Sequence, residues 1–195
     1  MVTGMVRLCN VCVISLSAAV LSLAGATSIA GIAHQKFNRI GSGKLALGTH
    51  VDISPAELTA WANDEARLYA PGAARNVKLH LTTNGATASM LVDFLKLRQS
   101  ATGEQPGWLM KNLFAGEREV TVTGRFQSRN GRARVDVDRV EVSGVPLEGS
   151  TLTFLIDNFV RPTFPDVKVN EWFVLGFHID RFTISPALVS VFIGK

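Results

Sequence analysis

The sequence predicts an α+β protein in which a curved antiparallel sheet, built from β-hairpins, packs against two main helices. Two Asn-Gly pairs, Asn84-Gly85 and Asn130-Gly131, each lie between runs of alternating apolar and polar residues. Asn-Gly favours the tight turn of a β-hairpin. A third observation is the order of the elements: strands come in local pairs, with helices between the pairs. This order favours α+β over a βαβ arrangement.

The N-terminus reads as a secretory signal. Residues 8–33 carry no charged side chain and follow Arg7, which is typical of a signal sequence. Small residues offer two cleavage sites, one after Ala26 and one after Ala30. We therefore predict a signal peptide over residues 1–30 and an exported chain, periplasmic or extracellular.

An uncleaved membrane anchor is the alternative, since the uncharged run is longer than the ~20 residues that span a bilayer. Lys36, Arg39 and Lys44 follow the run closely, and positive charge normally stays on the cytoplasmic side. This charge counts against both export and an outward-facing anchor. Both cysteines, Cys9 and Cys12, lie inside the run, so a processed chain would have neither a disulfide nor a cysteine ligand.

Without residues 1–30, which contain Arg7 but no acidic residue, the balance of 20 basic and 16 acidic residues becomes 19 against 16, a net charge of +3. This mildly basic charge does not indicate nucleic-acid binding. Residues 31–49 are glycine-rich and basic, and we expect a linker there or a first edge strand around Lys44 to Leu47. Residues 50–195 are long enough for a single α+β domain that rests on its hydrophobic core.

The first helix of this domain begins at Ser54. Ser54 is the N-cap, Pro55 takes the first helical position, and Glu57 closes a capping box. Apolar residues then recur at helical spacing, and Pro71-Gly72 ends the helix.

The two hairpins follow, over about residues 76–98 and 118–143. In the return strand of the second hairpin, Val135 and Val137 occupy odd-numbered positions, whereas Val140 and Val142 occupy even-numbered positions. A β-bulge near Asp138-Arg139 would bring all four valines to one face.

The end of the chain is expected to hold a helix and a final hairpin. Val145-Pro146 introduces the helix, which carries Leu152, Leu155, Ile156 and Phe159 on one side and is stopped by Pro162 and Pro165. Strands are then expected from Phe173 to Ile184 and from Leu188 to Ile193, joined at Ser185-Pro186.

Enzyme and metal motifs are missing from the sequence. Gly41-Ser42-Gly43-Lys44 lacks both the first glycine and the Ser/Thr of a phosphate-binding loop. His34, His50, His80 and His178 have no metal-binding spacing, and no G-x-S-x-G elbow occurs. We therefore expect a non-enzymatic protein without a cofactor or metal.

Four arginines form the densest basic cluster, around the turn of the second hairpin: Arg125, Arg129, Arg132 and Arg134. They can protect an exposed turn from edge-to-edge aggregation. Alternatively, they can attract anionic lipid headgroups or an anionic membrane surface. Asp136 and Asp138 share a strand face with Arg132 and Arg134, which predicts a solvated ladder of ion pairs.

Aromatic residues are abundant late in the chain. They can form the core, or they can line an apolar groove between sheet and helices that holds acyl chains. The candidates for such a groove are Trp61, Phe154, Phe159, Trp172 and Phe177.

Several segments together carry a resemblance: the helix from Ser54 to Tyr69, the strands from Val77 to Phe94, the run Val120-Thr121-Val122-Thr123-Gly124, the step Gly144-Val145-Pro146 and the final hairpin. With these, about residues 50–195 resemble uncharacterised exported bacterial proteins, which are distantly similar to actinobacterial LmeA-like phospholipid-binding proteins. The resemblance implies non-enzymatic binding of a phospholipid or another envelope amphiphile and carries over no site residue. The alternative is an envelope structural or protein-interaction module with a closed core.

Overall fold

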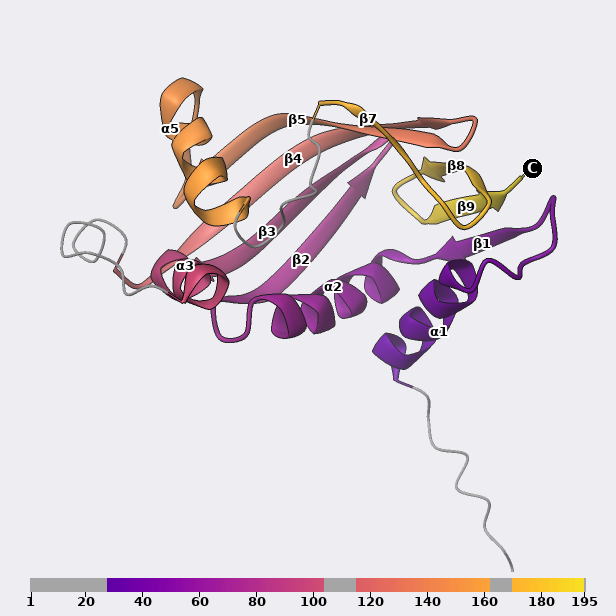
Figure 1. The fold of residues 1–195 in the computed structure, drawn as a ribbon, viewed down its shortest axis with the longest axis horizontal. Helices are drawn as coiled ribbons and strands as arrows, with labels where there is room; N and C mark the ends of the chain where they lie inside the picture. Colours follow the sequence, from indigo (N-terminus) through magenta and orange to yellow (C-terminus); the bar gives the residue numbers. More distant parts are fainter. Residues whose placement is uncertain (1–27, 104–114, 162–169, 195) are drawn as a thin grey trace, which may run out of the picture.

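The computed structural model describes residues 28–103, 115–161 and 170–194, and they form an α+β fold (Figure 1). The helices are α1 (Ile29–Gly41), α2 (Pro55–Tyr69), α3 (Phe94–Thr102), α5 (Gly149–Leu155) and the π-helical turn η1 (Ile156–Val160). The strands are β1 (His50–Ile53), β2 (Ala74–Thr82), β3 (Gly85–Asp93), β4 (Glu117–Arg129), β5 (Arg132–Val142), β6 (Val145–Pro146), β7 (Trp172–Val174), β8 (Ile179–Ile184) and β9 (Val189–Ile193). The predicted α+β class with antiparallel hairpins is confirmed.

The strands form two antiparallel sheets. The small sheet has the order β1-β9-β8, and the large, open sheet has the order β2-β3-β4-β5-β6, with β7 also paired to β5. Figure 1 shows α3 and α5 at one end of the large sheet, whereas the small sheet lies at the other end. The small sheet therefore joins the first strand after α1 to the last strand of the chain.

The first hairpin is confirmed, but its turn lies one residue earlier than the sequence suggests. Thr82 pairs with Gly85, so Thr83 and Asn84 turn the chain, and Asn84 has a φ of 56°. Gly85 already belongs to β3. A Cβ atom there would lie 2.8 Å from Thr82 Oγ1 and 3.1 Å from the carbonyl oxygen of Gly124. The glycine thus allows close approach of neighbouring strands.

The second hairpin has the predicted turn. Asn130 and Gly131, with φ values of 50° and 71°, separate the paired residues Arg129 and Arg132. Positive φ at both central residues is what a type I′ turn requires.

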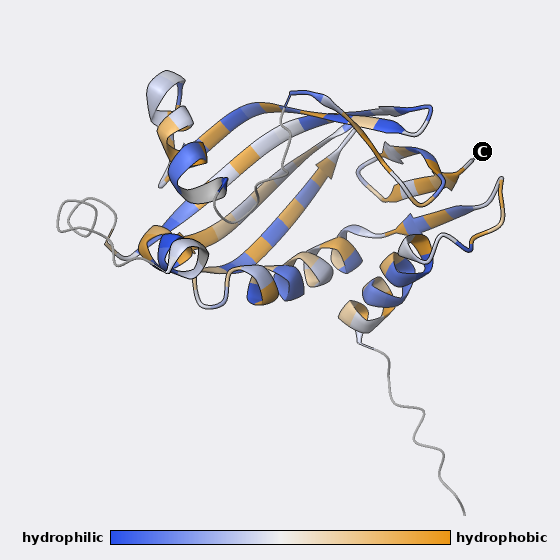
Figure 2. Cartoon of the chain, in the orientation of Figure 1, coloured by the Kyte–Doolittle hydropathy of each residue, from blue (hydrophilic) through white to orange (hydrophobic). Residues whose placement is uncertain are grey.

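The predicted β-bulge is also present, in β5. Thr123 pairs with Arg139, but the next residue of β4, Gly124, pairs with Val137. Asp138 is therefore the extra residue of the bulge, and the apolar residues on both sides of it face the same way. Figure 2 shows the resulting alternation of hydrophobic and hydrophilic residues along β2 to β5.

Helix α1 replaces the linker or edge strand that we expected over residues 31–49. The helix begins with Ser28 as N-cap, whose Oγ accepts a hydrogen bond from the Gly31 N–H at 3.0 Å. Ala33 and Ile40 are buried. The first part of α1 overlaps the uncharged run of residues 8–33. The sequence pattern therefore indicates an export signal there and does not reveal the helix. The first strand is β1, not the stretch around Lys44 to Leu47.

An ion pair fixes α1 to α2. Lys36 Nζ lies 2.6 Å and 2.8 Å from the two carboxylate oxygens of Glu57. Glu57 also closes the predicted capping box, because it accepts a hydrogen bond from the Ser54 N–H at 2.7 Å. At the next residue of α1, and one turn further along α2, the Phe37 ring stacks on Trp61 with 4.2 Å between ring centroids. Helix α1 is therefore part of the folded domain.

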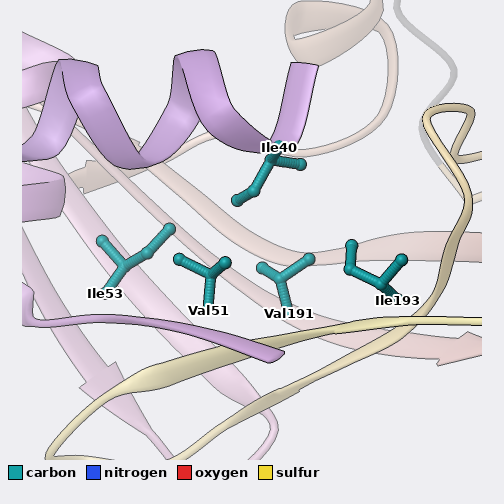
Figure 3. Close-up of a cluster of buried hydrophobic side chains, with 5 residues drawn as sticks. All are labelled: Ile40, Val51, Ile53, Val191 and Ile193. Carbon is teal, nitrogen blue, oxygen red and sulfur yellow. The ribbon is translucent and has the colours of Figure 1, made fainter. Parts of the chain in front are cut away.

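The small sheet and α1 enclose one buried core. Ile40 of α1 packs against Val51 and Ile53 of β1 and against Val191 and Ile193 of β9 (Figure 3). A second buried cluster, formed by Val92, Phe94 and Leu155, lies where α3 and α5 meet the large sheet. The two clusters thus form separate cores, one at each end of the molecule.

The other differences from the expected elements concern strand ends. Residues 94–98, expected in the first hairpin, belong to α3, because Asp93 caps this helix by accepting a hydrogen bond from the Lys96 N–H at 3.1 Å. The expected second helix is present as α5 and η1, but Val145–Pro146 pairs with β5 as β6. The strand expected from Phe173 to Ile184 is interrupted between β7 and β8.

Among the described residues, no helix has the length and apolar character needed to cross a bilayer. Residues 1–27, which make up most of the predicted signal peptide, lie outside the described residues.

The contact between Lys36 and Glu57 generates a pH-dependent prediction. Burial raises the pKa of Glu57, but hydrogen bonds from Lys36 and Ser54 outweigh it, so the pKa lies below the ordinary value of 4.5. The contact therefore stabilises the fold above about pH 4.5, and this stability is lost as the pH falls through the lowered pKa. Glu57→Gln should reduce the free energy of unfolding at neutral pH by about 2 kcal/mol.

Urea unfolding of both proteins at neutral pH and near pH 3 checks this, because the difference should shrink in acid. Glu65→Gln on the same helix is the control and should change stability by less than about 0.5 kcal/mol. An equal loss at both pH values would contradict the role of the Glu57 charge.

Candidate functional site

A row of apolar side chains crosses the large sheet without being buried. Leu79, Ala88, Val122 and Val140 lie side by side on β2, β3, β4 and β5, as the strand register requires. Each is half-buried, and none belongs to either buried cluster. We call these four residues the apolar strip.

The apolar strip lies between two covered rows of the same sheet face. On the α5 side, Met90, Val120 and Val142 pack against the cluster around Leu155. On the other side, Phe126 contacts Phe182 of β8 edge to face, with 6.4 Å between ring centroids. The strip thus lies between two parts of the face that other elements contact, and its own side chains stay partly exposed.

The structure does not bring the five predicted groove aromatics together. Trp61 is stacked on Phe37 in the α1–α2 contact. Phe154 lies on α5 and is 42% exposed, whereas Trp172 lies in β7 at the other end of the large sheet. Phe177 follows β7 and is 56% exposed. The side chain of Phe159 lies outside the described part of the chain.

Ion pairs of the predicted kind lie on the polar face of the sheet, but they join the two carboxylates to Arg125 and Arg134, and not to Arg132 as expected. Arg125 Nη2 lies 2.7 Å from Asp138 Oδ1, and this carboxylate raises the pKa of Arg125 through a hydrogen bond and its charge. Arg134 Nε lies 2.6 Å from Asp136 Oδ1. These two arginines are therefore partners of strand carboxylates.

The other two arginines oppose each other at the hairpin turn. Arg129 pairs with Arg132 across β4 and β5, and both are exposed. Like charges directly opposite on paired strands destabilise the pairing. No acidic side chain forms a salt bridge with either arginine in the described ranges. The turn therefore carries uncompensated positive charge.

An open cavity of about 170 Å³ lies beside this charge, lined by Arg129, Asn130, Arg132 and Trp172. The Arg129 guanidinium carbon lies 5.0 Å from the centroid of the Trp172 ring, which is cation–π distance. The indole thus supports one guanidinium while leaving its other surface open. The cavity combines two cations with an aromatic wall.

The segment after β7 adds exposed apolar side chains to this end of the molecule. Val174, which pairs with Arg132, is 74% exposed, and Phe177 is 56% exposed. Three successive residues are left-handed: Gly176 has a φ of 69°, Phe177 of 49° and His178 of 58°. For non-glycine residues this conformation costs roughly 1–2 kcal/mol each. Phe177 is thus exposed at a point where the backbone is strained.

Backbone hydrogen bonds fix that segment to the hairpin turn. The Leu175 N–H donates to the Gly131 carbonyl at 2.9 Å, and the Gly131 N–H donates to the Asp180 carbonyl at 2.7 Å. The Gly194 N–H donates to the His178 carbonyl at 2.8 Å. The turn, the segment and the end of β9 are therefore held as one structure.

Two histidines lie near carboxylates, but neither pair has the geometry of an activated nucleophile. His50 Nε2 lies 3.6 Å from Asp52 Oδ2, and the Ser190 hydroxyl donates to Asp52 Oδ1 at 2.6 Å. The carboxylate, not the imidazole, lies between the other two groups, so His50 is not placed to take the serine proton. The expectation of a non-enzymatic protein stays a prediction.

The second pair joins α1 to α2. His34 Nε2 lies 3.0 Å from Asp64 Oδ2. This hydrogen bond lowers the pKa of Asp64, partial burial opposes it, and Arg67 lowers the pKa further. Across the part of the chain that the structure describes, no group of three His, Cys, Asp or Glu side chains could hold a metal ion.

The apolar strip was not named as a site from the sequence, although its residues were visible. Leu79, Ala88 and Val122 belong to the alternating runs that predicted the hairpins. Alternation shows which residues share a face, but not which part of that face other elements cover.

A search with protein-family models, with curated proteins and with solved structures finds no match to the chain.

The division of the arginines into two pairs predicts different effects on stability. Arg134→Gln should reduce the free energy of unfolding by about 0.5–1 kcal/mol, because Asp136 loses its partner. The double change Arg129→Gln and Arg132→Gln should leave it within about 0.5 kcal/mol, because repulsion is removed and no ion pair is lost.

Urea unfolding at low and high salt measures both effects. High salt should reduce the cost of Arg134→Gln, since screening weakens the ion pair in the parent protein. A marked loss of stability in the double variant would show that Arg129 and Arg132 are structural.

Proposed function

We propose that the protein is exported and that it binds a phospholipid-like or other envelope amphiphile, without catalysis, along the apolar strip. The observation that carries this proposal is the half-buried state of Leu79, Ala88, Val122 and Val140 between two covered rows. The strip runs across four strands and contains no polar side chain. An acyl chain laid along it would replace water over the whole row.

The expected gain comes from apolar surface removed from water. Each methylene group of an acyl chain contributes about 0.8 kcal/mol when it is fully buried. The valine, leucine and alanine side chains contact an acyl chain without directional hydrogen bonds. The strip would therefore select ligands by the length and apolar character of their acyl chains more than by a particular chemical structure. This fits a carrier of envelope lipids better than a receptor for one small polar ligand.

The competing proposal is an envelope structural or protein-interaction module with a closed core. A substitution at Ala88 distinguishes the amphiphile-binding proposal from the closed-core proposal. Ala88→Trp should fill an open strip, reduce uptake of a fluorescent phospholipid several-fold and leave stability within about 1 kcal/mol. In a closed core the same change would overpack the interior and cost about 1–3 kcal/mol.

Ser89→Trp is the matched control, because Ser89 is the next residue of β3 and points to the other face. It should leave phospholipid uptake unchanged. Organic extraction of the purified protein and mass spectrometry should also identify a bound amphiphile. Repeated absence of lipid together with no uptake by the parent protein would overturn the carrier proposal.

The uncharged run of residues 8–33 supports export, and the position of α1 bears on where the chain would be cleaved. Cleavage after Ala26 would keep Ser28, the N-cap of α1, whereas cleavage after Ala30 would remove it. Loss of such a cap costs about 1 kcal/mol. We therefore expect a processed chain to begin at Thr27.

Cell fractionation with N-terminal sequencing tests this expectation. A chain that starts at Gly31 should also be less stable than one that starts at Thr27, by about 1 kcal/mol in urea unfolding. Recovery of a membrane-bound protein that retains Met1 or Val2 would contradict cleavage.

A further inference from the structure

We propose that the end of the molecule formed by the β4–β5 turn and the segment after β7 is a docking surface for an anionic lipid membrane. We call it the basic tip and define it by Arg129, Arg132, Trp172, Val174 and Phe177. Figure 1 shows the β4–β5 turn at the end of the large sheet where β8, β9 and the C-terminus also lie. The proposal is independent of amphiphile binding by the apolar strip.

The first argument is charge complementarity. Arg129 and Arg132 repel each other across the turn. Two acidic side chains near the turn are engaged with other arginines: Asp136 lies 2.6 Å from Arg134, and Asp180 lies 2.9 Å from Arg181. Lipid phosphates would neutralise the two free charges, and guanidinium groups bind phosphate through paired hydrogen bonds.

The second argument is the exposed apolar surface that flanks this charge. Val174 and Phe177 are both more than half exposed, which brings no benefit to a surface that meets water alone. A bilayer interface accepts both kinds of group, because apolar side chains enter the acyl boundary while cations stay with the headgroups. Trp172, beneath Arg129, is the residue type most favoured at that boundary.

The third argument is that the basic tip is held together before any partner binds. Gly131 bonds to Leu175 on one side and to Asp180 on the other. The left-handed residues Phe177 and His178 form a turn that the Ile179 N–H closes by donating to the Gly176 carbonyl at 2.9 Å. Little ordering is therefore needed on contact, and a rigid surface loses less entropy when it binds.

The open form of the cavity favours a membrane over a small soluble anion. Its lining consists of Arg129, Asn130, Arg132 and Trp172, and it leaves the guanidinium groups exposed. A free phosphate would stay largely hydrated there and its attraction would be screened by salt. A membrane presents many phosphates at once and also accepts Phe177.

The experiment compares binding of the full chain to two kinds of vesicle, one of phosphatidylcholine alone and one that also contains phosphatidylglycerol. Residues 8–33 can bind both kinds, so the measured quantity is the ratio of the two partition constants. Arg129→Gln with Arg132→Gln should reduce this ratio by about 25-fold at low salt, from about a factor of five for each arginine. High salt should reduce the ratio for the parent protein and leave the variant almost unchanged.

Arg39→Gln with Arg118→Gln is the matched control, because it removes the same net charge from exposed arginines outside the basic tip. It should change the ratio by less than about threefold. Phe177→Asn should weaken binding to both kinds of vesicle while leaving the ratio unchanged, since it removes insertion but not charge.

Three outcomes would overturn the proposal. The first is an equal fall of the ratio in the tip and control variants, which would make the effect one of net charge. The second is displacement of the protein from vesicles by inorganic phosphate at low concentration, which would make the tip a soluble-anion site. The third is a double variant with an unchanged ratio but with lost binding to an immobilised acidic polypeptide, which would make the tip a surface for an acidic protein.

Discussion

The register of β4 against β5 is the constraint on which both candidate surfaces depend. The bulge at Asp138 lets Val137 and Val140 face the same way although they lie three residues apart. In a regular strand without the bulge, every side chain beyond Asp138 would change faces. The apolar strip would then lose Val140, and Arg139 and Glu141 would turn toward the apolar face. The bulge therefore maintains both the apolar and the polar face.

Two separate hydrophobic cores stabilise the fold at the two ends of this sheet. One joins α1 to the small sheet through Ile40, and the other joins α3 and α5 to the large sheet through Leu155. Each core stabilises one end, so the middle of the apolar face need not be buried for the fold to be stable. The β4–β5 turn is held by backbone hydrogen bonds to the segment after β7. Neither the apolar strip nor the basic tip therefore has to be buried for the fold to be stable.

The hairpins, the bulge and the capping box of α2 were predictable because each depends on residues close together in the sequence. Helix α1 was not, because its apolar spacing merges with an uncharged run that signals export. The turn at Asn84 was misplaced by one residue, since Gly85 is required by the nearby Gly124 carbonyl of another strand. Likewise, proximity in the sequence grouped four arginines, but the positions of Asp136 and Asp138 across the sheet separate Arg125 and Arg134 from the two at the turn.

The pairing of β1 with β9 has a consequence for the time at which the protein folds. Val51 meets Val191 across this pair, so the core around Ile40 needs both the beginning and the end of the domain. Contacts between such distant residues form slowly, because a long loop must close first. A ribosome-bound chain cannot complete this core until its last strand has emerged. This part of the fold therefore stays open throughout synthesis, whereas the core around Leu155 does not depend on β9.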